Sequence, residues 1–228
     1  MFSVVILAAG MGNRLGRSLP KSLTELADGR TIMRQQLDNI QAAYGDVPVT
    51  IVVGYRAESI VEAFPEATFV YNDEYDITNT SKSLMRALRE TPDGGVLWMN
   101  GDVVFDPQVL LRSAHLVDQD RSFVTVNTSS VADEEVKYTV TPEGHIRELS
   151  KIVVDGLGEA VGINYIDSAS KATLLTHLAR VNSQDYFERA LELAIEQNNL
   201  LVEPVNISDL YAVEIDFAAD LERANLFV

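Results

Sequence analysis

Cysteine is absent from the sequence, and only three of its 228 residues are histidine. Without cysteine the chain can form neither a disulfide framework nor a thiolate metal site. Long apolar runs are missing too, since runs such as Val4–Ala9 are far too short to cross a bilayer. No basic segment precedes that run, so we expect no signal peptide and a cytoplasmic location.

Basic residues are scarce and unevenly placed. The chain has 18 lysines and arginines against 34 acidic residues, a net charge of −16. This balance argues against nucleic acid and anionic membranes as partners. Residues 1–34 nevertheless hold five basic and two acidic side chains, a balance of +3, so the remainder carries −19. A small polyanion would be attracted to the N-terminal segment, whereas a long one would be repelled elsewhere.

Short apolar runs alternate with helical patterns along the first half of the chain. Strands are predicted at residues 4–9, 49–54, 68–72, 96–102, 122–127, 160–166, 201–205 and 211–215. Helices are predicted at residues 31–44, 57–64, 81–89, 107–117, 168–180, 185–197 and 217–225. Residues 137–140 and 145–149 alternate around a "PEG" turn, which predicts an antiparallel hairpin. Together they predict one α/β domain over residues 1–228, a Rossmann-like three-layer sandwich with a mainly parallel mixed sheet.

A glycine-rich stretch, "GMGNRLG" at residues 10–16, follows the first predicted strand. A P-loop requires a glycine directly before Lys21-Ser22, where this chain has Pro20. A dinucleotide-binding fingerprint requires its third glycine one residue earlier than Gly16. The stretch therefore matches neither of these two phosphate-binding templates.

The same stretch still favours an anionic ligand. Gly10 and Gly12 allow the backbone to pass close to a ligand, and successive N–H groups can line an anion-binding concavity. Arg14 and Lys21 add the full positive charges that a triphosphate needs. On these residues alone, the alternative is a glycine turn with incidental basic neighbours.

Two aspartates end predicted strands elsewhere in the chain. Asp102 closes "LWMNGD", and Asp216 closes "YAVEID". In a parallel sheet the carboxyl ends of strands line up along one edge, where ligands bind. The glycine-rich stretch reaches the same edge, so these carboxylates are candidate Mg²⁺ ligands. The alternatives are a turn at Asp102 and an N-cap of the last helix at Asp216.

The motif "LAAGMGNRLG…PKSL" resembles the L-A-A-G-x-G-x-R…P-K motif of nucleotidyltransferases (pyrophosphorylases), which join a nucleoside triphosphate to a phosphorylated sugar or small alcohol. Every fixed position of the motif is present. The resemblance implies Mg²⁺-dependent nucleotidyl transfer, with Arg14 and Lys21 as catalytic residues and Asp102 and Asp216 as metal ligands. It also implies that the nucleotide contacts Leu7, Ala8, Ala9, Gly10, Met11 and Gly12.

Later segments resemble bacterial phosphocholine cytidylyltransferases. In "YNDEYDITNTSKSLMRAL", residues 71–88, the resemblance places Asn79 and Ser83 near the base or ribose. In residues 150–167 it implies that Lys151 contacts the acceptor phosphate and that Glu159 binds the acceptor. In "QDYFERALELAIEQ" it places Tyr186 beside the acceptor. The alternatives are a helix cap and polar loop for residues 79–83, and a solvent-exposed lysine at Lys151.

The first choice is a cytidylyltransferase that uses CTP and a small phosphorylated alcohol, such as phosphocholine, or a phosphonate. Two alternatives stay open: a sugar-1-phosphate nucleotidyltransferase using UTP, dTTP or CTP, and a catalytically silent nucleotide-binding regulator. The oligomeric state is open between a monomer and a homodimer. Phosphocholine would require an aromatic cage, for which the candidates are Tyr71, Tyr75, Tyr165 and Tyr186.

Overall fold

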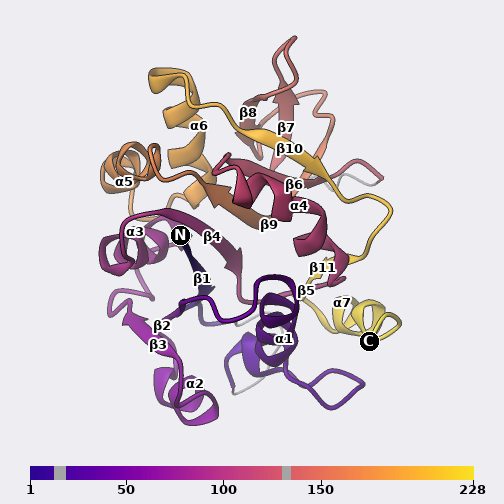
Figure 1. Cartoon of the computed structure of the whole chain (residues 1–228). Helices are drawn as coiled ribbons and strands as arrows, with labels where there is room; N and C mark the ends of the chain where they lie inside the picture. Colours follow the sequence, from indigo (N-terminus) through magenta and orange to yellow (C-terminus); the bar gives the residue numbers. More distant parts are fainter. Residues whose placement is uncertain (13–18, 130–134) are drawn as a thin grey trace.

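The central sheet of this computed structural model, which describes residues 1–12, 19–129 and 135–228, has the strand order β10-β6-β9-β4-β1-β2-β3 (Figure 1). The hairpin strands β7 and β8 join the sheet through β9. The strands of this sheet are β1 (Phe2–Ala8), β2 (Val49–Val53), β3 (Thr68–Tyr71), β4 (Gly95–Asn100), β6 (Phe123–Asn127), β7 (Lys137–Val140), β8 (Ile146–Ser150), β9 (Gly158–Ile166) and β10 (Glu203–Asn206).

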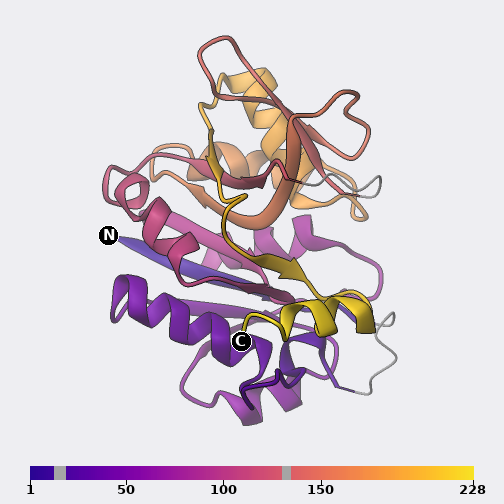
Figure 2. The same ribbon diagram turned by 90° about the vertical axis from the view of Figure 1, so that its right-hand side faces the viewer.

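Helices cover both faces of the sheet, because its central strands are apolar on both sides (Figures 1 and 2). One core cluster includes side chains of α3, α5 and α6, and the other includes side chains of α1, α2 and α4. The helices are α1 (Ile32–Tyr44), α2 (Ala57–Ala63), α3 (Thr80–Glu90), α4 (Gln108–Asp118), α5 (Lys171–Arg180), α6 (Phe187–Asn198) and α7 (Ala218–Ala224). This three-layer α/β arrangement confirms the predicted fold class.

The sheet is mixed, as predicted. Strands β3, β2, β1 and β4 are mutually parallel, whereas β9 runs antiparallel to both β4 and β6. A second sheet of two strands was not predicted: β5 (Val103–Phe105) pairs antiparallel with β11 (Ala212–Glu214). The predicted strand at 211–215 is thus present, but its partner is β5. This pairing brings the C-terminal part of the chain back to the turn that follows β4.

Helix α1 fixes that turn from the side. Thr31 caps the helix, its hydroxyl accepting from Arg34 N at 3.2 Å. Five residues further on, buried Gln36 donates through Nε2 to the carbonyls of Asn100 and Val103 at 2.9 and 2.8 Å. The backbone on both sides of Asp102 is therefore held by a buried side chain, which orients the end of β4.

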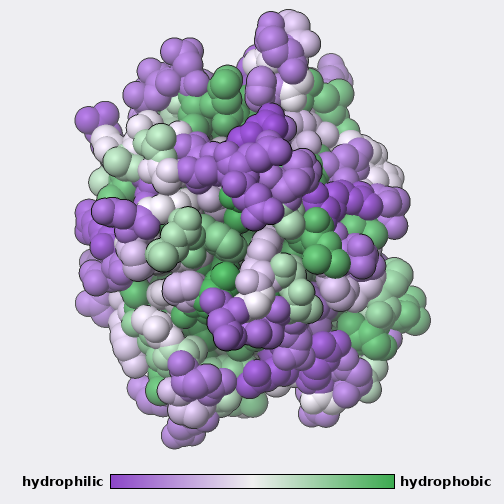
Figure 3. Space-filling model, in the orientation of Figure 1, coloured by the Kyte–Doolittle hydropathy of each residue, from purple (hydrophilic) through white to green (hydrophobic). Residues whose placement is uncertain are grey.

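Hydrophilic residues cover much of the face shown in Figure 3, as the net charge of −16 leads one to expect. An apolar area over α7 contains the exposed side chains of Phe217, Leu226 and Phe227 (Figure 3). Every helix in the described ranges is too short or too polar to span a bilayer.

Candidate active site

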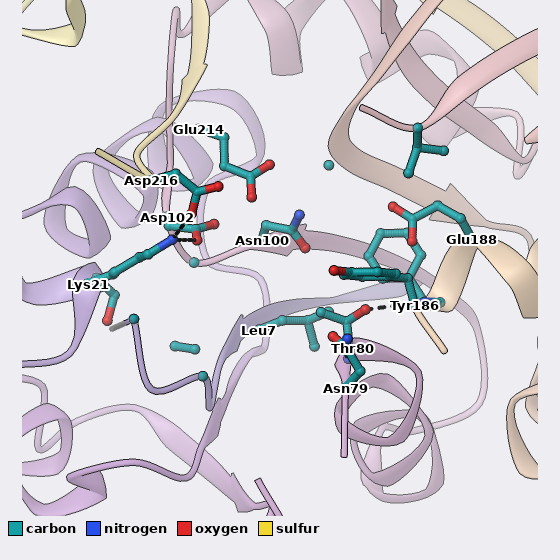
Figure 4. Close-up of a pocket in the computed structure, with 18 of the residues that line it drawn as sticks. Leu7, Lys21, Asn79, Thr80, Asn100, Asp102, Tyr186, Glu188, Glu214 and Asp216 are labelled. Carbon is teal, nitrogen blue, oxygen red and sulfur yellow. Dashed lines mark hydrogen bonds and ion pairs between the residues drawn. The ribbon is translucent and has the colours of Figure 1, made fainter. Parts of the chain in front are cut away.

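A cavity of about 500 Å³ opens at the carboxyl ends of β1 and β4 (Figure 4). It is lined from one side by the loop after β1, Lys21 and the β5–β11 region. The other side is formed by the N-terminal ends of α3 and α6 and by β9. Parts of the chain that are far apart in sequence thus converge on one site, at the sheet edge that the sequence predicted.

The glycine loop approaches this cavity through Gly10, Met11 and Gly12. Gly12 has φ +59°, which L-amino acids with a side chain adopt at a cost. A Cβ atom on Gly12 would also lie 2.7 Å from Cγ of Lys21. Glycine at this position therefore makes room for the Lys21 side chain as well as for the backbone turn.

Lys21 joins two parts of the chain that are far apart in sequence. Its Nζ donates to Asp102 Oδ2 at 3.0 Å and also to Asp216 Oδ1 (Figure 4). Burial opposes a charge on Lys21, but the two carboxylates outweigh burial and raise the pKa of Lys21. The lysine is therefore a fixed positive charge at the cavity wall.

Glu214 is a third carboxylate at this place, and sequence reasoning missed it. One carboxylate oxygen from each of Asp102, Glu214 and Asp216 lies within 4.8 Å of the others. The charge on Asp102, followed by desolvation, raises the pKa of Glu214 well above its usual range. The "EID" spacing was an available signal, because residues two apart on a strand face the same side.

The pairing of β11 with β5 explains how these carboxylates meet. Glu214 lies opposite Val103, and the amide of Ile215 donates to the carbonyl of Asp102 at 2.9 Å. The suggestion that Asp216 caps the last helix is wrong, because the N-cap of α7 is Phe217. Asp220, in the first turn of the helix, accepts from the amides of Asp216 and Phe217 at 3.1 and 2.8 Å. The Asp216 side chain faces Lys21.

This donor set fits a hard divalent cation such as Mg²⁺, because carboxylate oxygens are the ligands that such ions prefer. Lys21 contacts both Asp102 and Asp216, so its ammonium group places a positive charge between the two carboxylates. The two predicted metal ligands are therefore brought together, and Glu214 is added to them.

The other end of the cavity contains groups from α3, α6 and the segment after β8. Asn79 caps α3, its Oδ1 accepting from the Thr80 amide at 2.8 Å, and both residues line the cavity. Lys151 Nζ lies 4.7 Å from the centre of the Tyr186 ring, and Tyr186 is half-exposed. Asn79 thus has the capping role weighed earlier and also a place in the site.

Glu188 was not predicted, and it lines the same end (Figure 4). It lies in the first turn of α6 and is 8% exposed. Burial raises the pKa of its carboxyl to about 7, while the charge of Lys151 lowers it and that of Glu135 raises it. An acidic residue two positions after the tyrosine was the available signal, although glutamate in a first helical turn is common.

Some predicted residues lie elsewhere. Ala9, Ser83 and Glu159 do not line the cavity as the described residues form it. Ser83 is buried and accepts from Asn72 Nδ2 at 3.0 Å, and Glu159 pairs with Asn127 in the sheet. Leu7, Ala8, Gly10, Met11, Gly12, Lys21, Asn79, Asp102, Lys151, Tyr186 and Asp216 do line it. Arg14 lies outside the described residues.

Two of the four tyrosine candidates for an aromatic cage lie away from the cavity. Tyr165 is buried in β9, where its hydroxyl donates to Asp120 at 2.8 Å, and Tyr71 lies on β3 away from the cavity lining. Tyr75 and Tyr186 alone of the four line the cavity. Trp98 and Phe187 are core residues, since they are at most 1% exposed and their rings meet edge to face.

Comparison with known proteins agrees with this geometry. CMP-5'-(3-aminopropyl)phosphonate synthase of Streptomyces rubellomurinus is 28% identical over an alignment of 258 positions, gaps included, which covers 97% of this chain and 38% of that protein. The bifunctional protein GlmU of a Cyanothece species is 27% identical over 231 residues, 95% of this chain and 48% of that protein. The chain spans less than half the length of these relatives.

Solved structures share the fold over nearly the whole chain. The CTP:phosphocholine cytidylyltransferase of Streptococcus pneumoniae superposes with a TM-score of 0.80 at 18% identity, covering 99% of this chain and 98% of that one. The inositol-1-phosphate CTP transferase of T. maritima gives 0.77 at 16% identity, covering 99% and 97%. Residues 4–194 match the sequence family described as the MobA-like NTP transferase domain. The chain therefore belongs to this family of nucleotidyltransferase domains.

Proposed function

We propose that this chain transfers CMP from CTP to an anionic oxygen of a small phosphorylated alcohol or a phosphonate, releasing pyrophosphate. The observation that carries the proposal is the convergence of the glycine loop, Lys21 and the carboxylates of Asp102 and Asp216 on one cavity. That combination suits a reaction in which two anions must be held together. Positioning and charge neutralisation are then the main sources of rate.

The reaction is a single displacement at phosphorus. An oxygen of the acceptor phosphate or phosphonate forms a bond to the α-phosphorus of CTP. The bond between that phosphorus and the oxygen bridging to the β-phosphate breaks, and pyrophosphate leaves with the electron pair. The attacking oxygen is already an anion at neutral pH, so the chain needs no general base.

Each part of the site has a task in this proposal. Backbone N–H groups at Gly10–Gly12 donate hydrogen bonds to phosphate oxygens, and Lys21 stabilises the charge that grows on departing pyrophosphate. Asp102 and Asp216, together with Glu214, hold Mg²⁺. The ion supplies positive charge to the phosphate oxygens. Lys151 orients the acceptor, and Asn79 faces the base or ribose.

The choice of CTP and of a phosphonate or phospho-alcohol is supported by the printed names of similar proteins. The relative that covers 97% of this chain is named for a CMP-phosphonate product. Two structural neighbours are named for CTP, one with phosphocholine and one with inositol-1-phosphate. Sugar-1-phosphate transfer is the second candidate, because a UDP-glucose pyrophosphorylase has the same fold with a TM-score of 0.79.

The test is pyrophosphate release by the purified chain with Mg²⁺. Five nucleotides (CTP, UTP, dTTP, ATP and GTP) are combined with phosphocholine, phosphoethanolamine, 2-aminoethylphosphonate, inositol phosphate and several sugar-1-phosphates. Release that requires CTP and one of the first four acceptors supports the proposal. Release confined to a sugar-1-phosphate supports the second candidate. Nucleotide binding without release from any pair contradicts both and favours a silent binding protein.

A further inference from the structure

Glu188 is a buried carboxylate that faces the cavity with one oxygen unused. Its Oε2 is inaccessible to solvent and has no hydrogen-bond partner among residues 1–12, 19–129 and 135–228. The side chain points from the start of α6 into the cavity, on the side opposite Asp102, Glu214 and Asp216 (Figure 4). A buried acceptor without a hydrogen-bond partner costs free energy, so a ligand that donates a hydrogen bond to Oε2 removes that cost and binds more tightly.

The surroundings of Glu188 suit a positive charge. Lys151 Nζ lies 4.7 Å from the centre of the Tyr186 ring, and its positive charge lowers the pKa of Glu188. Glu135 lines the same cavity and adds a second negative charge near Glu188. With both glutamates ionised, the described residues at this end of the cavity include two acids and one lysine, an excess of negative charge that a ligand cation would offset.

Three apolar side chains, Val136, Ala160 and Phe187, are among the residues that line this cavity. Apolar neighbours limit the water that competes for a charge-assisted hydrogen bond to the carboxylate. The cavity therefore has two chemically distinct ends: a phosphate end at Lys21 and the aspartates, and an end that favours a cation at Glu188.

Building on the proposed function, we infer that Glu188 binds the ammonium group of the acceptor, so that the acceptor is a zwitterionic aminoalkyl phosphate or phosphonate. Its anionic group lies at the Lys21 end and its amine reaches Glu188. An ammonium with N–H groups satisfies Oε2, whereas a quaternary ammonium has no proton to donate. Phosphates of neutral sugars do not complement this end, because they have no positive charge.

A purely structural role for Glu188 makes a different prediction. A carboxylate in the first turn of a helix interacts favourably with the helix N-terminus, whatever lies in the cavity. If that were its only role, Glu188→Gln would affect all acceptors to the same extent. Discrimination between acceptors that differ only in the amine separates the two roles.

The experiment compares 2-aminoethylphosphonate with ethylphosphonate, which lacks only the amine, and with phosphocholine, whose nitrogen is quaternary. Turnover is followed with CTP and Mg²⁺, and binding by calorimetry with Mg²⁺ and a non-hydrolysable CTP analogue. The variants are Glu188→Gln and, as a matched control, Glu196→Gln, an exposed position on the same helix. The KM for CTP reports whether the nucleotide site is intact.

We expect the wild-type chain to favour 2-aminoethylphosphonate over ethylphosphonate by about tenfold to a hundredfold, the range for a hydrogen bond to a charged group. It should favour it over phosphocholine as well. Glu188→Gln should raise KM or Kd for 2-aminoethylphosphonate by a similar factor. It should leave ethylphosphonate and CTP unchanged, and Glu196→Gln should behave as wild type.

Equal affinity of wild type for the two phosphonates overturns the inference without any variant, so a misfolded Glu188→Gln cannot rescue it. A uniform loss across acceptors in Glu188→Gln, or a preference for phosphocholine, also overturns it. Amine-dependent binding without turnover leaves the inference standing and contradicts the proposed function. Turnover of sugar-1-phosphates or neutral acceptors alone supports nucleotidyl transfer and contradicts the inference. If neither phosphonate binds, the inference fails.

Discussion

Lys21 donates through Nζ to Asp102 Oδ2 at 3.0 Å. It contacts Asp216 in the same way, although 195 positions separate the two residues in the chain. In the proposed reaction, a metal ion would occupy these carboxylates and the lysine would face phosphate. Lysine and metal therefore compete for the same oxygens in the nucleotide-free protein, which gives the first prediction.

Lys21→Met should increase the affinity of the nucleotide-free chain for Mn²⁺ by about tenfold, which corresponds to about 1.4 kcal/mol. The substitution removes the positive charge that holds both aspartates. Electron paramagnetic resonance of free Mn²⁺ during titration measures this. The same variant should lose turnover, because no cation remains to stabilise departing pyrophosphate.

Lys171→Met is the control, because Lys171 contacts the carbonyls of Thr91 and Pro92 far from the carboxylates. It should leave Mn²⁺ binding unchanged. Unchanged or weaker Mn²⁺ binding in Lys21→Met would show that lysine and metal do not compete.

Asp102→Asn and Asp216→Asn should each lower kcat by at least about a hundredfold while the fold is retained. Each change removes a negative charge from the proposed metal site and leaves the side-chain volume nearly constant. Steady-state turnover over a range of Mg²⁺ concentrations, with circular dichroism to monitor folding, tests this. Near-normal activity of either variant at ordinary Mg²⁺ would refute the metal assignment.

Glu214→Gln should have opposite effects on stability and on metal binding. The charge of Asp102 and desolvation raise the pKa of Glu214, so its ionised form destabilises the metal-free fold near neutral pH. Thermal unfolding in the presence of a chelator should therefore shift to higher temperature in the variant. Mn²⁺ affinity should fall, because one carboxylate is lost from the site. A fall in both quantities would mean that Glu214 has only a structural role.

Glu188→Gln should stabilise the chain at pH 8 and have little effect at pH 4. Burial raises the pKa of Glu188 to about 7 from an unfolded value near 4.5, with Lys151, Glu135 and Tyr186 as its charged or titratable neighbours in the cavity. The folded state then binds the proton more tightly, so stability falls as pH rises from about 4.5 to about 7. The loss is at most about 3 kcal/mol. Denaturant unfolding at several pH values measures it, and a wild-type-to-variant difference that is constant with pH would contradict it.

Gly12→Ala should lower turnover by more than the loss of folding stability alone would explain. The backbone cost of an alanine at φ +59° is about 1–2 kcal/mol. The new Cβ would also displace the aliphatic part of Lys21, on which the reaction depends. Gly29→Ala is a suitable control, because Gly29 also has positive φ and a Cβ added there would meet no atom within 4 Å. Equal effects of the two changes on turnover would rule out a special role for Gly12.

Local patterns were sufficient to predict most of the fold. Continuous apolar runs such as Val4–Ala9 marked the buried strands, and the polar breaks after them marked the edge where Asp102 and the glycine loop meet. The pairing of β11 with β5 was not predictable, because three-residue strands have too little periodicity to show a partner. That pairing is what brings Glu214 into the carboxylate group.

The site was predicted less completely than the fold. Lys21 and the two aspartates have sequence signals, since each follows a strand or lies in a specific motif. Glu188 has only a weak signal, an acidic residue two positions after Tyr186 in a first helical turn, because its importance comes from burial and from its unused oxygen. The tyrosine candidates could not be separated for a related reason: the sequence identifies aromatic residues, but it does not show that Tyr71 and Tyr165, both on strands, lie away from the cavity.

The measurement that tests the central claim most directly is phosphorus NMR of the chain with CTP, Mg²⁺ and 2-aminoethylphosphonate. Nucleotidyl transfer predicts that a mixed phosphonate–phosphate anhydride and pyrophosphate appear in equal amounts as CTP disappears. Asp102→Asn should produce neither. If CTP stays intact under these conditions and with every other acceptor, or if it is hydrolysed to CMP or CDP without a new anhydride, the proposed function is wrong.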